Sequence, residues 1–228
     1  MEGVFESENS IYMVLELLPG RNLLDRIQEN RGQFSTEEVK ELISRILDGL
    51  AALHRRRIMH RDLKPENIML RSQDGLRPVI ADFGLATHAD LDEYLFFRCG
   101  TPGYVAPEIV ALTESKHIEP QCDIFSAGVI FHLLLTRRPL FQGTKYDEVY
   151  RNNKNMNFSL EGPQYQQVDP QAMHLLTCML EADPSKRITA QEALNHPYLA
   201  FSNRFWDDKV SSPCSTEEGE PVSFSGCF

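Results

Sequence analysis

Residues 58–70 combine reactive side chains with apolar flanks, and this stretch is the strongest chemical signal in the sequence. Its eight middle positions, 60–67, hold five ionisable side chains and one amide, while the residues at either end are apolar. Burying these groups without partners would be costly, because an unpaired charge or amide loses its hydration. The pattern therefore predicts a polar loop held at a cleft by two anchored ends, where catalytic groups commonly lie.

A second cluster, Ala-Asp-Phe-Gly at 81–84, follows the apolar residues 78–80 and contains Asp82. Together with Asp62 and Asn67 of the first stretch, Asp82 would bring three oxygen-bearing side chains to one cleft. Hard oxygen ligands of this kind suit Mg²⁺. The sequence thus predicts Mg²⁺ as the metal of this cleft.

These segments resemble the catalytic loop and the metal-binding triplet of eukaryotic protein kinases. The loop reads His-Arg-Asp-Leu-Lys-Pro-Glu-Asn at 60–67, the triplet is Asp-Phe-Gly at 82–84, and Ala-Pro-Glu follows at 106–108. Three motifs in this order form a specific signature. A lysine two residues after the loop aspartate is typical of Ser/Thr kinases in the family. The stretch 100–108 is most similar to the calcium/calmodulin-dependent kinase group.

The resemblance implies a role for each residue of the site. Asp62 would accept or orient the proton of the substrate hydroxyl, and Lys64 would neutralise the phosphate during transfer. Thr101 would contact both of these side chains. Asn67 and Asp82 would hold Mg²⁺ at the phosphates of ATP.

The same resemblance assigns lesser roles to neighbouring residues. Phe83 would pack under the metal site, and Gly84 would allow the sharp exit of the chain. Residues 16–20 end in a Pro-Gly turn and would form the kinase hinge. There, backbone groups of Glu16 and Leu18 would meet the adenine of ATP. An ordinary strand exit is the alternative interpretation of this segment when the later motifs are set aside.

The elements that must position these residues can be predicted from sequence periodicity. Strand-forming runs at 4–5 and 11–15, joined through 7–10, predict a hairpin. Ser35 and Glu38 have the spacing of a capping box at the start of a long helix with one apolar face. This helix leads directly into the catalytic loop.

Further helices are expected at 23–30, 123–136, 146–151, 170–182 and 190–195. Arg187 matches the arginine that family members pair with the glutamate at Glu108. The three arginines at 55–57 would neutralise the negative end of the long helix. A docking patch is the alternative role for these arginines.

The implied fold class is α+β, a protein-kinase-like fold made up mainly of the helical C-lobe, with the last two strands of the N-lobe and the hinge. Residues 1–201 would form a partial kinase domain. Within it, 1–15 would be the N-lobe remnant, 16–20 the hinge and 21–201 the C-lobe. A tail at 202–228 is expected to be disordered, because it is rich in polar and small residues.

The sequence also departs from the family pattern. No Gly-x-Gly occurs in the 228 residues, and the first lysine is Lys40, which lies past the hinge in a predicted helix. The Gly-rich loop and the strand lysine with which kinases bind the ATP phosphates therefore have no counterpart here. The expectation is a kinase C-lobe with an N-lobe stub, left by an internal start or a truncated gene model and inactive by itself.

Three functions remain open at this point. The first is a protein Ser/Thr kinase that transfers the γ-phosphate of ATP to Ser or Thr of protein substrates. The second is a catalytically inactive kinase-like binding or scaffold protein. The intact motif residues disfavour this alternative, because a site that no longer transfers phosphate does not need them. The third is an ATP-dependent small-molecule kinase, which the peptide-docking stretch 100–108 disfavours. A partner that covers the exposed N-lobe edge is a further expectation.

Composition limits the partners and the compartment. The net charge of −10 argues against a nucleic-acid partner. The five cysteines include no Cys-x-x-Cys pair, which indicates reduced thiols and disfavours a zinc site. The first residues do not resemble a signal peptide, and no apolar run is long enough to cross a membrane. These features predict a cytoplasmic protein without a membrane partner.

Overall fold

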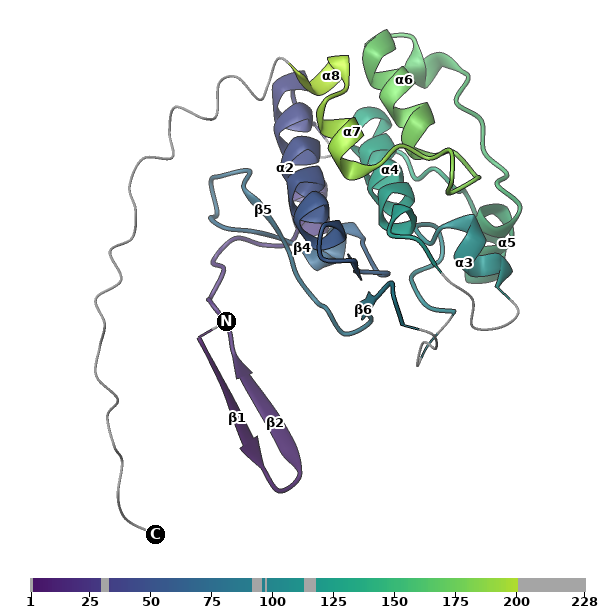
Figure 1. Ribbon diagram of the computed structural model, residues 1–228. Helices are drawn as coiled ribbons and strands as arrows, with labels where there is room; N and C mark the ends of the chain where they lie inside the picture. The colour runs from purple at the N-terminus through teal and green to yellow at the C-terminus, as the bar shows by residue number, and fades with distance from the viewer. Residues whose placement is uncertain (1, 30–32, 92–95, 97, 113–117, 201–228) are drawn as a thin grey trace.

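The computed structural model describes residues 2–29, 33–91, 96, 98–112 and 118–200. A helical body accounts for most of them, and a two-stranded hairpin extends away from this body (Figure 1). The predicted tail at 202–228 lies outside the described residues, as does the last position of the helix predicted at 23–30.

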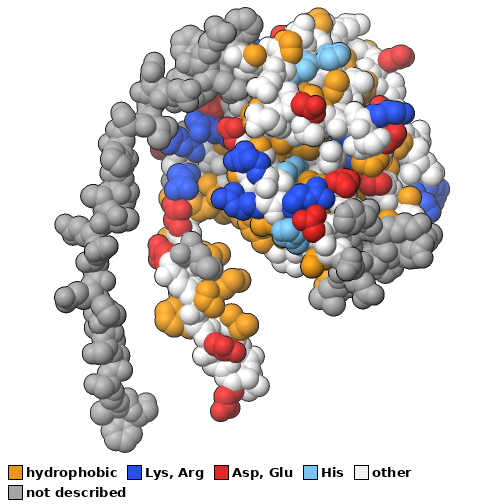
Figure 2. Space-filling view, viewed as in Figure 1, with side chains coloured by type: hydrophobic (Ala, Val, Ile, Leu, Met, Phe, Trp, Pro, Cys, Tyr) orange, Lys and Arg blue, Asp and Glu red, His pale blue; other side chains and the backbone are white. Residues whose placement is uncertain are grey.

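The predicted hairpin is confirmed. β1 (Gly3–Ser7) and β2 (Ser10–Val14) pair antiparallel, and no other described strand joins them. Their apolar side chains are exposed, with Phe5 at 61% and Ile11 at 69%, and Figure 2 shows such side chains along the hairpin. An isolated two-stranded hairpin is marginally stable in water, so we expect this element to add little to the stability of the fold.

Helix α2 (Thr36–His54) begins at the predicted capping box. The Ser35 hydroxyl accepts a hydrogen bond from the backbone N–H of Glu38 at 3.2 Å, and the Glu38 carboxylate accepts one from the Ser35 N–H at 2.7 Å. Two otherwise unpaired donors of the first turn are thereby satisfied. The apolar face of α2 is buried against the other long helix, and its C-terminal end leads towards the loop at 60–67.

The other long helix, α4 (Gln121–Thr136), passes through the centre of the core. It begins two residues before the predicted start at 123 and ends at the predicted residue 136. Side chains are buried around almost its whole circumference, which is typical of a core helix. Figure 1 shows α4 beside α2, with the shorter helices around the pair.

The remaining described helices and 3-10 turns are short. They are α1 (Leu23–Glu29), η1 (Pro65–Asn67), α3 (Pro107–Ala111), α5 (Tyr146–Lys154), η2 (Pro163–Tyr165), α6 (Pro170–Met179), α7 (Ala190–Leu194) and α8 (Pro197–Ala200). The predicted starts at 146, 170 and 190 are confirmed, and α5 continues three residues past its predicted end at 151.

The predicted end of α6 at residue 182 is wrong, because the helix stops at Met179. The backbone carbonyls of Glu181 and Ala182 instead accept hydrogen bonds from the guanidinium of Arg187, at 2.7 and 3.2 Å. A continued helix would direct these carbonyls towards N–H groups one turn later. The carbonyls that follow Met179 are thus bonded to the Arg187 side chain and not to backbone N–H groups of a continued helix.

Two short antiparallel ladders hold the catalytic loop and the segment that follows it. β3 (Ile58–Met59) pairs with β6 (Thr87–His88), and β4 (Ile68–Leu70) pairs with β5 (Pro78–Ile80). The predicted combination of α and β elements is therefore confirmed. None of the described helices is both long enough and apolar enough to cross a lipid bilayer.

Candidate active site

Asp62 is the centre of a compact polar cluster. Its Oδ1 atom accepts a hydrogen bond from the Thr101 hydroxyl at 2.6 Å. Its Oδ2 atom lies 2.9 Å from the Lys64 ammonium and accepts a hydrogen bond from the Asn67 amide at 3.1 Å. Lys64 also donates to Thr101 Oγ1 at 2.8 Å. The structure thus brings together the four residues proposed as catalytic, and the predicted contact of Thr101 with Asp62 and Lys64 is confirmed.

A buried carboxylate that the sequence reasoning missed supports this cluster. Asp123, in the first turn of α4, is fully buried. Its Oδ1 accepts the backbone N–H of Arg61 at 2.8 Å. Its Oδ2 accepts that of His60 at 2.8 Å and lies 3.0 Å from Nε2 of His54. The backbone just before Asp62 is therefore held by the core helix.

The charge state of Asp123 follows from these contacts. Burial by itself raises the pKa of a carboxyl group, but the hydrogen bond and charge of His54 and the two backbone N–H groups outweigh it. The net effect lowers the pKa of Asp123, so the group stays ionised at neutral pH. An acidic residue in the first turn of an otherwise apolar helix is the sequence signal that could have revealed it.

Arg61 and His60 tie the catalytic loop to the segment after Asp82. His60 is buried, its Nε2 lies 2.9 Å from the carbonyl oxygen of Ala81, and its ring meets Phe83 edge-on at 5.1 Å between centroids. Phe83 itself is 47% exposed. The Arg61 guanidinium donates to the backbone carbonyl of Leu85 at 2.9 Å. The two segments are therefore linked by backbone carbonyls on one side and arginine and histidine side chains on the other.

Pairing of β4 with β5 places Asn67 beside the residue that precedes Asp82. The backbone N–H of Ala81 donates to the carbonyl oxygen of Asn67 at 2.9 Å. The Asp82 carboxylate is exposed, accepts the N–H of Gly84 at 3.2 Å, and has no basic partner among the described residues. The acidic side chain of Asp82 is therefore left available for a cation.

The chain turns at Gly84 and Leu85, where the N–H of Ala86 donates to the carbonyl oxygen of Phe83 at 3.0 Å, and Asp82 adds a left-handed residue just before this turn. Asp82 has a φ of 61°, in the left-handed region, whereas Gly84 does not adopt a positive φ. Aspartate tolerates this conformation because its carboxylate can accept a hydrogen bond from the backbone two residues on. The bond to the Gly84 N–H is of this kind.

The oxygen donors of Asn67 and Asp82 fit Mg²⁺. Among the described residues, no group of three or more His, Cys, Asp or Glu side chains is placed to hold a metal ion alone. Mg²⁺ usually takes one or two carboxylates from the protein and fills its other positions with water and substrate phosphates. The oxygen donors of Asn67 and Asp82 match that requirement.

The residues predicted to meet adenine lie on the segment between β2 and α1. Glu16 pairs with Arg71 at 2.5 Å, and Leu18 is half-buried. The segment packs tightly on β4, since a Cβ atom at Gly20 would lie 2.1 Å from the carbonyl oxygen of Leu70. It therefore adjoins the strand that leaves Asn67. No described hydrogen bond or ion pair joins Glu16 or Leu18 to Asp62 directly.

The predicted ion pair between Glu108 and Arg187 is confirmed. The two guanidinium nitrogens of Arg187 meet the two carboxylate oxygens of Glu108 at 2.7 and 2.9 Å. The Arg187 side chain is fully buried and that of Glu108 is 20% exposed. Because α3 follows the stretch 100–106, this bidentate pair joins that stretch to the helical core.

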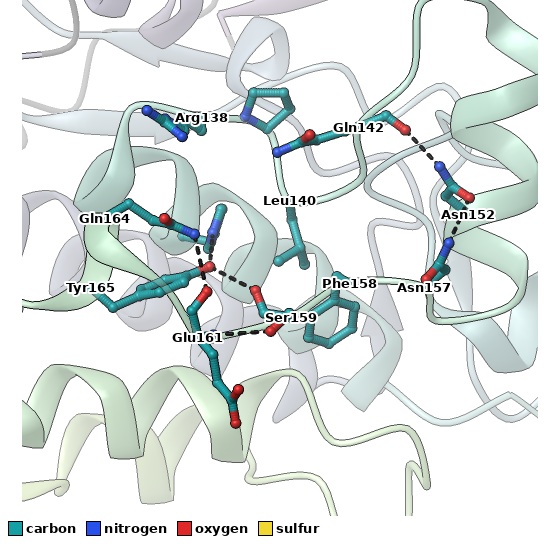
Figure 3. A pocket seen from close by; sticks show the side chains of 12 residues that line it. Arg138, Leu140, Gln142, Asn152, Asn157, Phe158, Ser159, Glu161, Gln164 and Tyr165 are labelled. Atoms are coloured by element: carbon teal, nitrogen blue, oxygen red, sulfur yellow. Dashed lines mark hydrogen bonds between the residues drawn. The ribbon is translucent and has the colours of Figure 1, made fainter.

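A separate cavity of about 430 Å³ lies between the end of α4, the end of α5 and η2. Figure 3 shows Tyr165 at its side, with the hydroxyl bonded to the backbone carbonyl of Ser159. The same hydroxyl lies 2.8 Å from Nε2 of His132, which is buried. None of the residues predicted for the catalytic site lines this cavity.

His132 makes the fold sensitive to acid. Burial lowers the pKa of His132 to about 4, from about 6.5 in an unfolded chain. Between these values the unfolded chain binds a proton that the folded protein does not, so the free energy of unfolding falls as the pH falls below about 6.5. We expect His132 to account for a loss of about 2 kcal/mol between pH 7.5 and 5.

Urea unfolding at the two pH values measures this effect in the native chain and in His132→Gln. The variant should lose less stability on acidification than the native chain. His88→Gln, at an exposed position, is the matched control and should behave as the native chain does. An equal acid sensitivity in His132→Gln and the native chain would contradict the assignment.

Comparison with known proteins places this site in a family. Residues 1–199 match the protein kinase domain family. "Probable serine/threonine-protein kinase fhkC" of Dictyostelium discoideum is 36% identical over 196 residues, covering 86% of this chain and 33% of that protein. Myosin light chain kinase A of the same organism is 34% identical, covering 89% of this chain and 68% of that protein. Human calcium/calmodulin-dependent protein kinase type 1B is 33% identical, covering 93% and 61%.

The chain therefore belongs to the protein kinase domain family. Within it, the chain is a Ser/Thr kinase domain similar to the calcium/calmodulin-dependent kinases, as the sequence predicted. The kinase-like fold class is likewise confirmed. The chain spans a third of the length of the first of these relatives and about two thirds of the others.

Proposed function

We propose that this chain carries the phosphoryl-transfer site of a protein Ser/Thr kinase, with Asp62 as the residue that accepts or orients the proton of the substrate hydroxyl. The observation that carries the proposal is the cluster around Asp62. Both carboxylate oxygens are held by neighbouring side chains, and the fixed backbone of the loop limits their movement. A carboxylate held in this way is suited to orienting a hydroxyl group.

Lys64 and Thr101 complete the part of the site that faces the substrate. The Lys64 ammonium contacts both the Asp62 carboxylate and the Thr101 hydroxyl, where it can stabilise negative charge on a phosphoryl group. Asn67 and Asp82 would hold Mg²⁺, and backbone groups at Glu16 and Leu18 would hold the adenine of ATP. When bound, Mg-ATP supplies the phosphoryl group and the charge neutralisation that transfer requires.

The proposed substrates are Ser and Thr hydroxyls of proteins. A cavity of about 180 Å³ adjoins the segment that contains Thr101, and it is lined largely by apolar side chains such as Val105, Ile109 and Val110. It can receive an apolar side chain of a bound peptide. The described cysteines, Cys99, Cys122 and Cys178, are free thiols, which fits the proposed cytoplasmic location.

We further propose that activity does not require a phosphate on the segment 85–100. In kinases that use such a phosphate, it pairs with the loop arginine. Here the Arg61 guanidinium already donates to backbone carbonyls of that segment, those of Leu85 and Phe96. Thr87 and Tyr94 are the only hydroxyl-bearing residues from 85 to 100, and Tyr94 lies outside the described residues.

We expect Thr87→Ala and Tyr94→Phe to leave phosphotransfer unchanged in an active form of the protein. Phosphopeptide mapping of that form should show no stoichiometric phosphate at either position. A phosphate at one of them, together with loss of activity in the matching variant, would overturn the expectation.

The proposed function is tested on the 228-residue chain joined to an N-terminal kinase lobe. The assay measures transfer of the γ-phosphate of ATP to a basic Ser/Thr peptide, with Asp62→Asn as the blank. A kinase site requires that transfer disappear in the variant. A binding or scaffold protein would show no Asp62-dependent transfer in any form of the chain.

A further inference from the structure

Asn153 is a polar residue on the buried face of an otherwise amphipathic helix. It lies on α5, where Val149 and Tyr150 are partly buried against the core and Asn153 itself is completely inaccessible. A buried amide without partners is unfavourable by comparison with an apolar side chain of the same size. Its presence therefore requires polar partners in the core.

Both ends of the Asn153 amide are paired with one turn of the chain. Its Oδ1 accepts the backbone N–H of Gly103 at 3.0 Å, and its Nδ2 donates to the carbonyl oxygen of Val105 at 3.0 Å. The orientation of the amide is fixed, because the Gly103 N–H can only donate and the Val105 carbonyl can only accept. Asn153 thus clamps two backbone groups that are two residues apart.

The clamped turn begins at the residue that contacts Asp62. The carbonyl oxygen of Thr101 accepts the N–H groups of Tyr104 and Val105 at 3.0 and 3.1 Å. The side-chain hydroxyl of Thr101 donates to Asp62 and accepts from Lys64. A displacement of the turn therefore displaces the Thr101 hydroxyl from between these two side chains.

We propose that Asn153 is a positioning residue that acts through the turn at 101–105, holding Thr101 between Asp62 and Lys64 and so coupling α5 to the proposed catalytic pair. The assignment of Asp62 and Lys64 as that pair rests on the proposed function. The physical coupling from Asn153 to Lys64 does not, and it can be measured without ATP or turnover.

The test uses the 228-residue chain and the variant Asn153→Leu, which keeps the side-chain size and removes both hydrogen bonds. Asn152→Leu is the matched control. Asn152 stands next to Asn153 on the same helix and also makes two amide hydrogen bonds, to the Gln142 carbonyl at 2.7 Å and to Asn157 at 3.1 Å, but neither reaches the turn. Thr101→Ala serves as the positive control.

Two measurements follow the coupling along its path. Amide hydrogen exchange reports the turn at 101–105, and acylation of individual lysines, resolved by mass spectrometry, reports the Lys64 ammonium. Loss of a hydrogen bond shifts a local opening equilibrium by about two- to tenfold. We expect exchange in the turn and acylation of Lys64 to rise by about that factor in Asn153→Leu. Lys186, which is 74% exposed, should react at the same rate in all variants.

Each outcome bears on the proposal. Faster exchange in the turn with unchanged Lys64 acylation would reduce Asn153 to a structural clamp and overturn it. An equal rise in Asn152→Leu would mean general loosening and would also overturn it. If Asn153→Leu does not fold, Asn153→Asp keeps the acceptor for Gly103 and replaces the donor to Val105 with a carboxylate oxygen that repels the Val105 carbonyl, so exchange and acylation should rise there too. In the native chain, a Gly103 amide without protection from exchange would refute the clamp whatever the variants do.

Discussion

Glu108→Gln should lower the free energy of unfolding by about 3–5 kcal/mol. The substitution leaves the Arg187 guanidinium charged in a site where its side chain has no exposure to water. Desolvating an unpaired charge is among the largest penalties that a single substitution can create. Arg187 cannot move out to water easily, because it also donates to the carbonyl oxygens of Gln121 and Glu181.

Urea unfolding followed by circular dichroism measures this loss, with Arg56→Ala as the control. The Arg56 side chain is exposed, lies just past the end of α2, and donates to the carbonyl oxygen of Ala52 in that helix. Substitutions of that kind usually change stability by no more than about 0.5 kcal/mol. Equal losses in Glu108→Gln and Arg56→Ala would show that the ion pair is solvated in solution, contrary to the buried geometry found here.

Local sequence signals predicted the elements whose ends are stabilised by hydrogen bonds between residues close in the sequence. The capping box of Ser35 and Glu38 located the start of α2 because both of its hydrogen bonds lie within one turn. The end of α6 could not be predicted in the same way. Beyond Met179, the carbonyl oxygens of Glu181 and Ala182 accept hydrogen bonds from the Arg187 guanidinium, a contact that the spacing of apolar residues does not reveal.

In the candidate site as well, residues of a contiguous motif were predictable from the sequence, and residues that act through tertiary contacts were not. Asp62, Lys64 and Asn67 were predictable because their motif is contiguous, and Thr101 because the family resemblance supplied its contact. Asp123 was missed, since its role depends on the packing of α4 beneath the loop. The left-handed conformation of Asp82 was not predicted, because it depends on the bond between the Asp82 carboxylate and the Gly84 N–H.

The exposed hairpin determines how the catalytic prediction has to be tested. Val4, Phe5, Ile11 and Met13 of β1 and β2 are each more than half exposed, and such a patch favours association with another surface.

The 228 residues include no Gly-x-Gly, and their first lysine lies within α2. The phosphates of ATP bound to this polypeptide by itself would therefore be exposed to water, which weakens the charge stabilisation that transfer depends on.

We expect the 228-residue chain, assayed by itself, to phosphorylate a basic Ser/Thr peptide far below the roughly 1–100 s⁻¹ typical of kinases. Joining it to an N-terminal kinase lobe that carries the Gly-rich loop and the strand lysine should raise turnover by orders of magnitude. Asp62→Asn should abolish that gain, because the loop carboxylate would lose its charge while keeping its size. Turnover on the order of 1 s⁻¹ by the chain alone, lost in Asp62→Asn, would show that the site needs no cover over the phosphates. If the joined protein kept its activity in Asp62→Asn, Asp62 would have no role in the mechanism.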